Sequence, residues 1–183
     1  MNTSHTLVST TDDYAHAPAA GDEAHATTTG DYAHATTAGD FAHATTAGKY
    51  AHATTAGGFA HAATTGDYAH ATAASDFAHA TTTGAYAHAA TAGRLTYATT
   101  TGIFAHAATT GRRSNASVSG ENAIAVAVGA NSYARAANGG FIVLAQYDGD
   151  TVVAVKTAQV GKDGIKPDTW YKLSPTGEFV EAE

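Results

Sequence analysis

Apolar and polar residues alternate inside a nine-residue unit that repeats along most of this chain. Written from Gly39, the unit reads Gly-Asp-Phe-Ala-His-Ala-Thr-Thr-Ala, and residues 12–137 hold fourteen such units without a slip in spacing. Aromatic, Ala, His, Ala and Thr alternate with period two, which is typical of a β-strand, and Thr-Ala-Gly-Asp then favours a turn. Short strands joined by glycine turns at a fixed period predict a parallel β-solenoid.

The abundance of alanine does not change this prediction. A glycine in every ninth position would cost a helix about 1 kcal/mol each time, and the β-branched threonine pairs add to that cost. A nine-residue period also fails to keep one face of a helix. We therefore expect an all-β fold.

The aromatic position shows a second, longer period. Tyrosine and phenylalanine alternate from unit to unit, which indicates a coil of eighteen residues with one strand on each of two facing sheets. We expect about seven coils, a rod of roughly 34 Å at ~4.8 Å per coil, and a drier phenylalanine side. The two sets are Tyr14, Tyr32, Tyr50, Tyr68 and Tyr86, and Phe41, Phe59, Phe77 and Leu95.

Two assignments of the interior are open. In one, the alanines before and after each histidine fill a very thin roll. In the other, the aromatic, His and Thr columns form the core and alanine faces outward. We favour the second, because the divergent unit 123–128 places Ile124 and Val126 at the histidine and threonine positions, where they would otherwise face solvent.

The same divergent region carries a local resemblance. Residues 121–136, Glu-Asn-Ala-Ile-Ala-Val-Ala-Val-Gly-Ala-Asn-Ser-Tyr-Ala-Arg-Ala, are similar to the head repeats of YadA-like trimeric autotransporter adhesins. The resemblance covers about sixteen residues and implies a parallel β-roll.

A second resemblance covers nearly the whole chain. The chain resembles phage- and prophage-encoded repeat proteins of unknown role, which combine A-T-T-G-D arrays with a short C-terminal β module. This resemblance implies common ancestry with those proteins. The matching segments here are Ala-Thr-Thr-Gly-Asp at 63–67, Phe141-Ile-Val-Leu-Ala-Gln146, Ile165-Lys-Pro-Asp-Thr-Trp-Tyr-Lys-Leu173 and Gly177-Glu-Phe-Val-Glu-Ala182.

The composition changes after the array. Strand patterns at 141–147, 151–160, 170–173 and 179–180 predict a small antiparallel sheet with Phe141, Trp170, Tyr171 and Phe179 in its core. Such a module would cover the last coil, whose edge is otherwise unpaired. The expected organisation is a tail at 1–11, the solenoid at 12–137 and the capping module at 138–183.

Charge and targeting signals restrict the partners. Residues 1–111 carry two basic and eight acidic residues, so the array is acidic and we expect no nucleic-acid partner. No signal peptide or apolar membrane span is visible, which predicts no membrane partner and a location in the host cytoplasm or a virion. A homo-oligomer through an alanine-rich or aromatic face is expected, as is contact with a host or virion protein.

Histidine is the most prominent candidate ligand. In stacked coils, imidazoles in register would lie ~4.8 Å apart, and such pairs can hold Zn²⁺, Ni²⁺ or Cu²⁺. Against a metal site, the units offer no second ligand type and no carboxylate to orient the rings, so a purely structural ladder without a cofactor is the main expectation. The candidates are His16, His25, His34, His43, His52, His61, His70, His79, His88 and His106.

No catalytic constellation stands out. Serines are sparse, no pair of carboxylates is set apart from the acidic turns, and no phosphate loop precedes a helix, so we expect no enzyme. Repeated threonine pairs could instead order water as ice-binding solenoids do. The leading hypothesis is a non-enzymatic phage-type solenoid that acts as a rigid spacer or protein-binding surface, with a metal binder and an ice-binding solenoid as alternatives.

Overall fold

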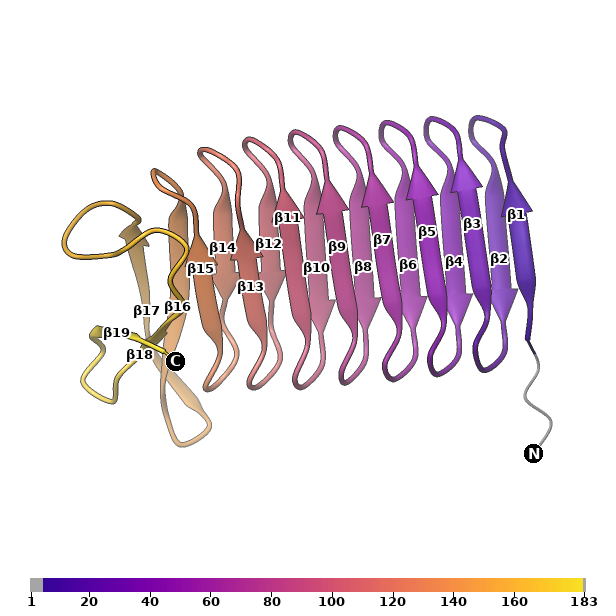
Figure 1. Ribbon diagram of the computed structural model, residues 1–183. Helices are drawn as coiled ribbons and strands as arrows, with labels where there is room; N and C mark the ends of the chain where they lie inside the picture. Colours follow the sequence, from indigo (N-terminus) through magenta and orange to yellow (C-terminus); the bar gives the residue numbers. More distant parts are fainter. Residues whose placement is uncertain (1–4, 183) are drawn as a thin grey trace.

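The computed structural model describes residues 5–182, and its fold is a parallel β-solenoid of about eight coils that ends in antiparallel strands (Figure 1). The chain forms a strand in one sheet, turns, forms an oppositely directed strand in the other sheet and turns again, so that each coil of eighteen residues contributes one strand to each sheet. The all-β solenoid predicted from the nine-residue period is confirmed. Among residues 5–182, no helix is long and apolar enough to cross a membrane.

The two sheets are called sheet A and sheet B. Sheet A contains β1 Leu7–Thr10, β3 His25–Thr29, β5 His43–Ala47, β7 His61–Thr65, β9 His79–Thr83, β11 Tyr97–Thr101, β13 Asn115–Val118, β15 Tyr133–Ala136, β18 Tyr171–Leu173 and β19 Phe179–Glu181. Sheet B contains β2 His16–Ala20, β4 His34–Ala38, β6 His52–Ala56, β8 His70–Ala74, β10 His88–Ala92, β12 His106–Thr109, β14 Ile124–Ala127, β16 Phe141–Asp148 and β17 Thr151–Gln159.

Like residues stack on like along both sheets. His16 pairs with His34 in sheet B, and Thr27 pairs with Thr45 in sheet A. The backbone hydrogen bonds repeat from coil to coil: the N–H of each histidine from His25 to His106 donates to the previous coil, as from His34 to the carbonyl of Ala15 at 2.8 Å. The N–H of Gly21 donates to the next coil, to the carbonyl of Ala38 at 3.0 Å. The eighteen-residue coil with two repeats per turn is therefore confirmed, with about eight coils rather than the expected seven.

The phase of strand and turn differs from the prediction. Each strand begins at the histidine and runs through His-Ala-Thr-Thr-Ala, whereas the aromatic residue lies in the turn. These aromatic residues adopt a left-handed backbone, with φ of 60° at Tyr32 and 61° at Phe41. Bulky side chains are uncommon there. The aromatic position therefore interrupts the period-two alternation that was expected to include it.

The favoured assignment of the interior was wrong. The alanines on either side of histidine are buried, as at Ala42 and Ala44, while the histidines, the aromatic residues and the first threonine of each pair face outward. The second threonine, such as Thr46, joins the alanines inside. A thin roll with five-residue strands leaves room only for small side chains between its sheets. Ile124 and Val126 are accordingly half-buried on the outer face.

Glycine at the start of the turn is required by the neighbouring coil. At Gly57, φ is +154°, a conformation that L side chains rarely adopt, and an added Cβ would clash with the carbonyl oxygen of Gly39 one coil earlier. Coil-to-coil backbone contact at the turns thus explains a glycine in nearly every unit.

The parallel ladder extends past both bounds expected for the array. At one end, β1 falls within the expected tail and pairs with β3, and at the other β16 begins as another coil by pairing with β14. In sheet B, β2 pairs with β4 and is the last strand on that side among the described residues. The exposed Pro18 lies in the middle of β2.

The four C-terminal strands form, but they do not make one separate sheet. β17 pairs antiparallel with β16 and extends sheet B, whereas β18 and β19 extend sheet A through an antiparallel contact of Ala134 with Tyr171 (Figure 1). Each half of the module therefore continues one face of the solenoid.

The core of the C-terminal module also differs from the expected aromatic cluster. Tyr171 is buried and the half-buried Phe179 packs against the core, as expected. Phe141 is exposed, and Trp170 is half-buried with its ring 4.7 Å from the guanidinium carbon of Arg135. Apart from Tyr171, the large buried side chains are aliphatic. Ile142 and Leu144 point inward from β16 because they occupy the inward positions of a further coil, and they fill the end of the roll with larger volume than alanine.

Candidate functional surface

Ten predicted ligand residues form two columns on opposite faces of the solenoid. Neighbouring rings are stacked with centroids 4.7–4.9 Å apart, as for His52 and His70, whose planes differ by 3°. Tyr97 continues the shorter column and stacks on His79 at 4.8 Å. Sheet B carries His16, His34, His52, His70, His88 and His106, and sheet A carries His25, His43, His61 and His79.

The histidine columns resist protonation. Partial burial lowers the pKa of His52 below the ordinary value of 6.5, because removal from water disfavours the charged ring. For His34, burial is again the first cause of the lowered pKa, and the neighbouring rings of His52 and His16 lower it further. His34 and His52 are therefore mainly neutral imidazoles at neutral pH.

Stacking does not gather these rings around a common point. No group of three or more His, Cys, Asp or Glu side chains within residues 5–182 is arranged to hold a metal ion. The lone pairs of stacked imidazoles lie in nearly parallel ring planes, so they point alongside one another instead of converging on one ion. Zinc needs about four ligands in a tetrahedron at about 2.0–2.3 Å, which the columns do not offer in this conformation.

Outward threonines form a column beside the histidines. The column is continuous from Thr36 to Thr72 in sheet B but is broken by Ala90, and in sheet A it is broken by Ala63. The neighbouring outward position is mostly alanine in sheet B. A regular two-dimensional array of hydroxyls, which an ice-binding face would use, is therefore interrupted on both sheets.

The turn aspartates stabilise the turn of the next coil. Asp31 accepts a hydrogen bond from the backbone N–H of Lys49 at 2.8 Å, and Asp40 accepts one from Gly58 at 2.8 Å. Asp76 accepts one from the N–H of Arg94 at 2.7 Å and binds its guanidinium at 2.7 Å. Because these carboxylates are engaged with the backbone, they act as structural acceptors along the edges of the rod.

The aromatic residues form one column along each edge of the solenoid. One is called the tyrosine column, and its rings stack at 4.9–5.2 Å. The other is called the phenylalanine column. The tyrosine column comprises Tyr14, Tyr32, Tyr50, Tyr68, Tyr86 and Phe104, and the phenylalanine column comprises Glu23, Phe41, Phe59, Phe77, Leu95 and Arg113.

The expectation of a drier phenylalanine side was wrong for the single chain. Phe41 is 53% exposed and Phe77 38%, against 42% for Tyr32 and 41% for Tyr86. Both columns lie in turns outside the roll, so the fold buries the side chains of neither edge more than those of the other. The alternation of tyrosine and phenylalanine therefore has no explanation within one chain.

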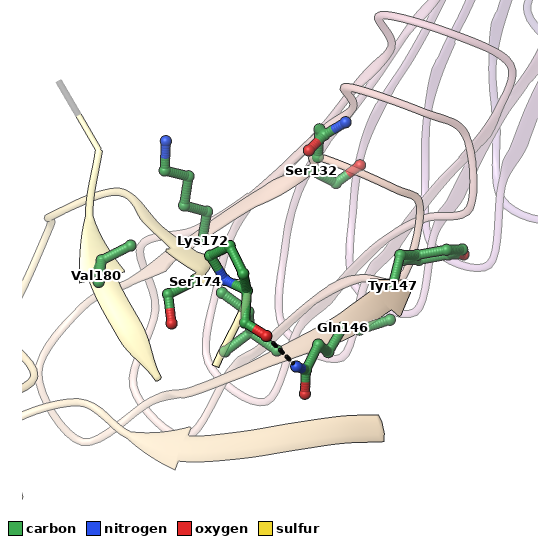
Figure 2. Close-up of a pocket in the computed structure, with 10 residues that line it drawn as sticks. Ser132, Gln146, Tyr147, Lys172, Ser174 and Val180 are labelled. Carbon is green, nitrogen blue, oxygen red and sulfur yellow. Dashed lines mark hydrogen bonds between the residues drawn. The ribbon is translucent and has the colours of Figure 1, made fainter. Parts of the chain in front are cut away.

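A hollow of about 320 Å³ lies at the junction of the solenoid and the C-terminal module (Figure 2). Ser132, Lys172 and Ser174 line it, and Gln146 closes one side by donating a hydrogen bond to the carbonyl of Pro175 at 2.7 Å. Its lining contains one amine, from Lys172, but no imidazole or carboxylate. The lining also holds the phenol of Tyr147, whose hydroxyl donates to the carbonyl of Val128 at 2.7 Å.

No protein-family model, curated protein or solved structure matches this chain significantly. The chain is a β-solenoid repeat protein on the evidence of its own geometry.

Three features of this surface were missed at the level of sequence. The turn aspartates were assigned no structural role, and the inward threonines were not separated from the outward ones. The opposite charges of Glu23 and Arg113 at the two ends of the phenylalanine column were also missed. The signal for this last feature was present, because both residues stand at the aromatic position of the repeat.

Proposed function

We propose that this protein is a non-enzymatic rod that holds two attachment points at a fixed separation and presents flat faces for protein binding. The observation that carries the proposal is the unbroken register, in which every coil repeats the hydrogen bonds of the last without an offset. A continuous two-sheet ladder with a filled interior has no hinge between its coils. Its length is therefore set by the number of coils.

The ends of the chain support a spacing role. The N-terminal strand β1 lies at one end of the solenoid and the C-terminal module lies at the other (Figure 1). Anything joined to these two ends would be held apart by the full length of the rod. A compact domain, whose ends usually lie close together, does not achieve this.

The faces support a binding role. Between Tyr14 and Gly111, every Asp, Glu, Lys and Arg stands in a turn, so the outer faces of both sheets carry only His, Tyr, Thr, Ala and Pro. A flat, uncharged surface with a constant repeat suits a partner that is itself extended or repetitive. The resemblance to phage-type repeat proteins favours a fibre element or a host-interaction protein as the setting.

The spacing role can be tested by changing the number of coils. Ala20→Cys and Ala92→Cys place two spin labels on exposed positions of one column of sheet B, in a chain without other cysteines. Four coils separate them, a distance of roughly 19 Å. Duplication of residues 39–56 should lengthen the label distance by ~4.8 Å and keep its distribution narrow.

A matched control inserts one nine-residue unit in place of two. This insertion moves residue 92 to the other sheet, so the label distance should depart from the ~4.8 Å series that whole coils produce. A broad distance distribution in the parent chain, or no lengthening on duplication, would show that the array is not a rigid rod.

A further inference from the structure

We propose that the phenylalanine column is a self-association surface, on which a second copy of this chain packs with its rod axis antiparallel to the first. The inference concerns one edge of the solenoid and does not depend on the spacer role. It starts from the order of side chains along that edge, which the coil brings into one line although they are eighteen residues apart in the sequence.

The column has an apolar middle and ends of opposite charge. Phe41, Phe59 and Phe77 stack with centroids 5.2 and 4.7 Å apart. Leu95 follows at the same turn position, also exposed. Glu23 occupies the first of these six positions and Arg113 the sixth, and the uncharged Asn131 continues the series in the next coil.

This order is complementary to itself when reversed. A two-fold axis between the third and fourth positions sets Phe59 against the partner's Phe77 and Phe41 against the partner's Leu95. The same axis sets Glu23 against the partner's Arg113. Every apolar residue then meets an apolar residue and each charge meets its opposite twice per dimer, as an isologous interface requires. A parallel arrangement would instead bring like charges together.

The turn residues next to the column repeat the same polarity. Asp22 and Asp40 lie beside its acidic end, whereas Arg94 and Arg112 lie beside its basic end. Between them, Asp76 is already held by Arg94 through the ion pair at 2.7 Å. Opposite ends of the edge therefore attract one another in an antiparallel pair, and this attraction also fixes the register.

The tyrosine column lacks this arrangement. Asp13, Asp31 and Asp67 lie along that edge with Lys49 among them, so its charges are not separated by sign. Tyrosine hydroxyls also keep a hydrogen bond with water, which phenylalanine cannot do. Since the two edges are equally exposed in one chain, a partner on the phenylalanine edge explains why that edge has lost its hydroxyls.

The charged ends are accessible to a partner. The Glu23 carboxylate contacts the exposed His5 at 3.0 Å and its side chain remains 46% exposed, and Arg113 is exposed beside Leu95. Arg112 has only a distant pairing with Asp150, at 3.8 Å. None of these contacts covers the edge.

The available area indicates a dimer of modest affinity. Six positions span about 24 Å, and a five-residue strand beside them adds a width of about 17 Å, which gives roughly 400 Å² per chain. That area is about half of a standard interface, a size typical of weak complexes. The strands of sheet A beside the column, from β3 to β13, carry no charged side chain, so their burial leaves no charge of the sheet unpaired.

The test is sedimentation equilibrium of the full chain from about 1 to 300 µM, a range that covers micromolar dissociation constants. We expect a monomer–dimer equilibrium in the parent chain. Glu23→Arg alone and Arg113→Glu alone should each raise the dissociation constant at least about tenfold, because each creates two like-charge contacts per dimer. Combining both substitutions in one chain should restore association.

Mixing the two single variants provides the sharpest outcome. A heterodimer of Glu23→Arg with Arg113→Glu has both charge contacts restored, so an equimolar mixture should associate more tightly than either variant alone. Phe59→Ser with Phe77→Ser should also weaken the dimer, whereas the matched change of Tyr50→Ser with Tyr68→Ser on the other edge should not. A parent chain that stays monomeric at about 300 µM, or a mixture that behaves like its components, would overturn the proposal.

Discussion

Thr91 and Thr96 face each other across the interior of the solenoid, with their hydroxyl oxygens 2.7 Å apart. Thr96 also donates to the hydroxyl of Ser114 one coil later, at 3.0 Å. In the other units from Ala15 to Ala105 the position of Thr96 is alanine, so a threonine that faces it has no hydroxyl partner there. The hydroxyls of Thr37, Thr46, Thr55, Thr64, Thr82 and Thr100 are among those buried without a hydrogen bond in residues 5–182.

This contrast predicts opposite effects for one conservative substitution. Thr46→Val should raise the free energy of unfolding by about 1 kcal/mol, because it replaces a buried hydroxyl without a partner by a methyl group of the same shape. Thr91→Val should lower it by a similar amount, since it removes a made hydrogen bond. Chemical denaturation of the two variants measures both values. A loss of stability in Thr46→Val would mean that water satisfies the hydroxyls inside the roll.

The histidine columns predict that acid destabilises the rod. The pKa values of the histidines named below are lowered from 6.5 in the folded chain, first by burial and in several cases by a neighbouring imidazole. Below pH 6.5 the unfolded chain therefore binds more protons than the folded chain, and stability falls as pH falls. The affected residues are His34, His43, His52, His61, His70, His79 and His88.

Thermal unfolding monitored by circular dichroism checks this prediction. The Tm should be constant above about pH 7 and should fall between about pH 6.5 and 5. Replacing His52 and His70 by glutamine should make the fall shallower, because two of the titrating rings are gone. A Tm that does not change across this range would contradict the prediction.

The period of the sequence was sufficient to predict the architecture, but not which residues face inward. Units of nine residues and the alternation of tyrosine and phenylalanine imply the eighteen-residue coil, whichever side chains face inward. The alternation separates alanine from the aromatic, His and Thr positions but does not say which set faces inward, and the choice rested on Ile124 and Val126, which lie half-buried on the outer face. No propensity assigns the left-handed backbone of Tyr32 or Phe41 to a bulky aromatic residue, so the pattern also placed the aromatic position in the strand when it lies in the turn.

The alanine interior predicts a sharp size limit. Ala53 is buried between the sheets, and it pairs with Ala35 and Ala71 in the coils before and after. Ala53→Leu should therefore destabilise the rod by about 1–3 kcal/mol or more through overpacking. Thr54→Leu, on the exposed position next in the strand, should change the free energy of unfolding by less than about 0.5 kcal/mol. Equal effects of the two substitutions would place the interior elsewhere.

Chelation provides a check on the histidine columns as metal ligands. Because stacked rings do not converge on one ion, we expect EDTA to leave the Tm of the untagged protein unchanged within about 1 °C. Elemental analysis of the same sample should find no stoichiometric zinc, nickel or copper. A fall in Tm on chelation that zinc reverses would instead support metal binding by the columns.

The candidate surface was predictable in part. The histidine columns follow directly from the repeat, because parallel stacking brings residues eighteen apart into contact. The roles of Asp31 and Asp76 could not be found in this way, since they depend on the turn geometry that presents a carboxylate to the next coil. The charge order of the phenylalanine edge depends on knowing that alternate units share that edge.

Pro18 has a consequence for how such rods meet end to end. In each strand, the N–H at the histidine and at the second residue after it points toward the preceding coil, and Pro18 occupies the latter position in β2. A strand that paired with this side of β2 would therefore lack one N–H donor. The carbonyl of Ala20 on the same side already accepts a hydrogen bond from the hydroxyl of Thr6 at 2.9 Å. The terminal strand of sheet B therefore discourages head-on polymerisation into amyloid-like filaments, a hazard that identical stacked strands otherwise invite.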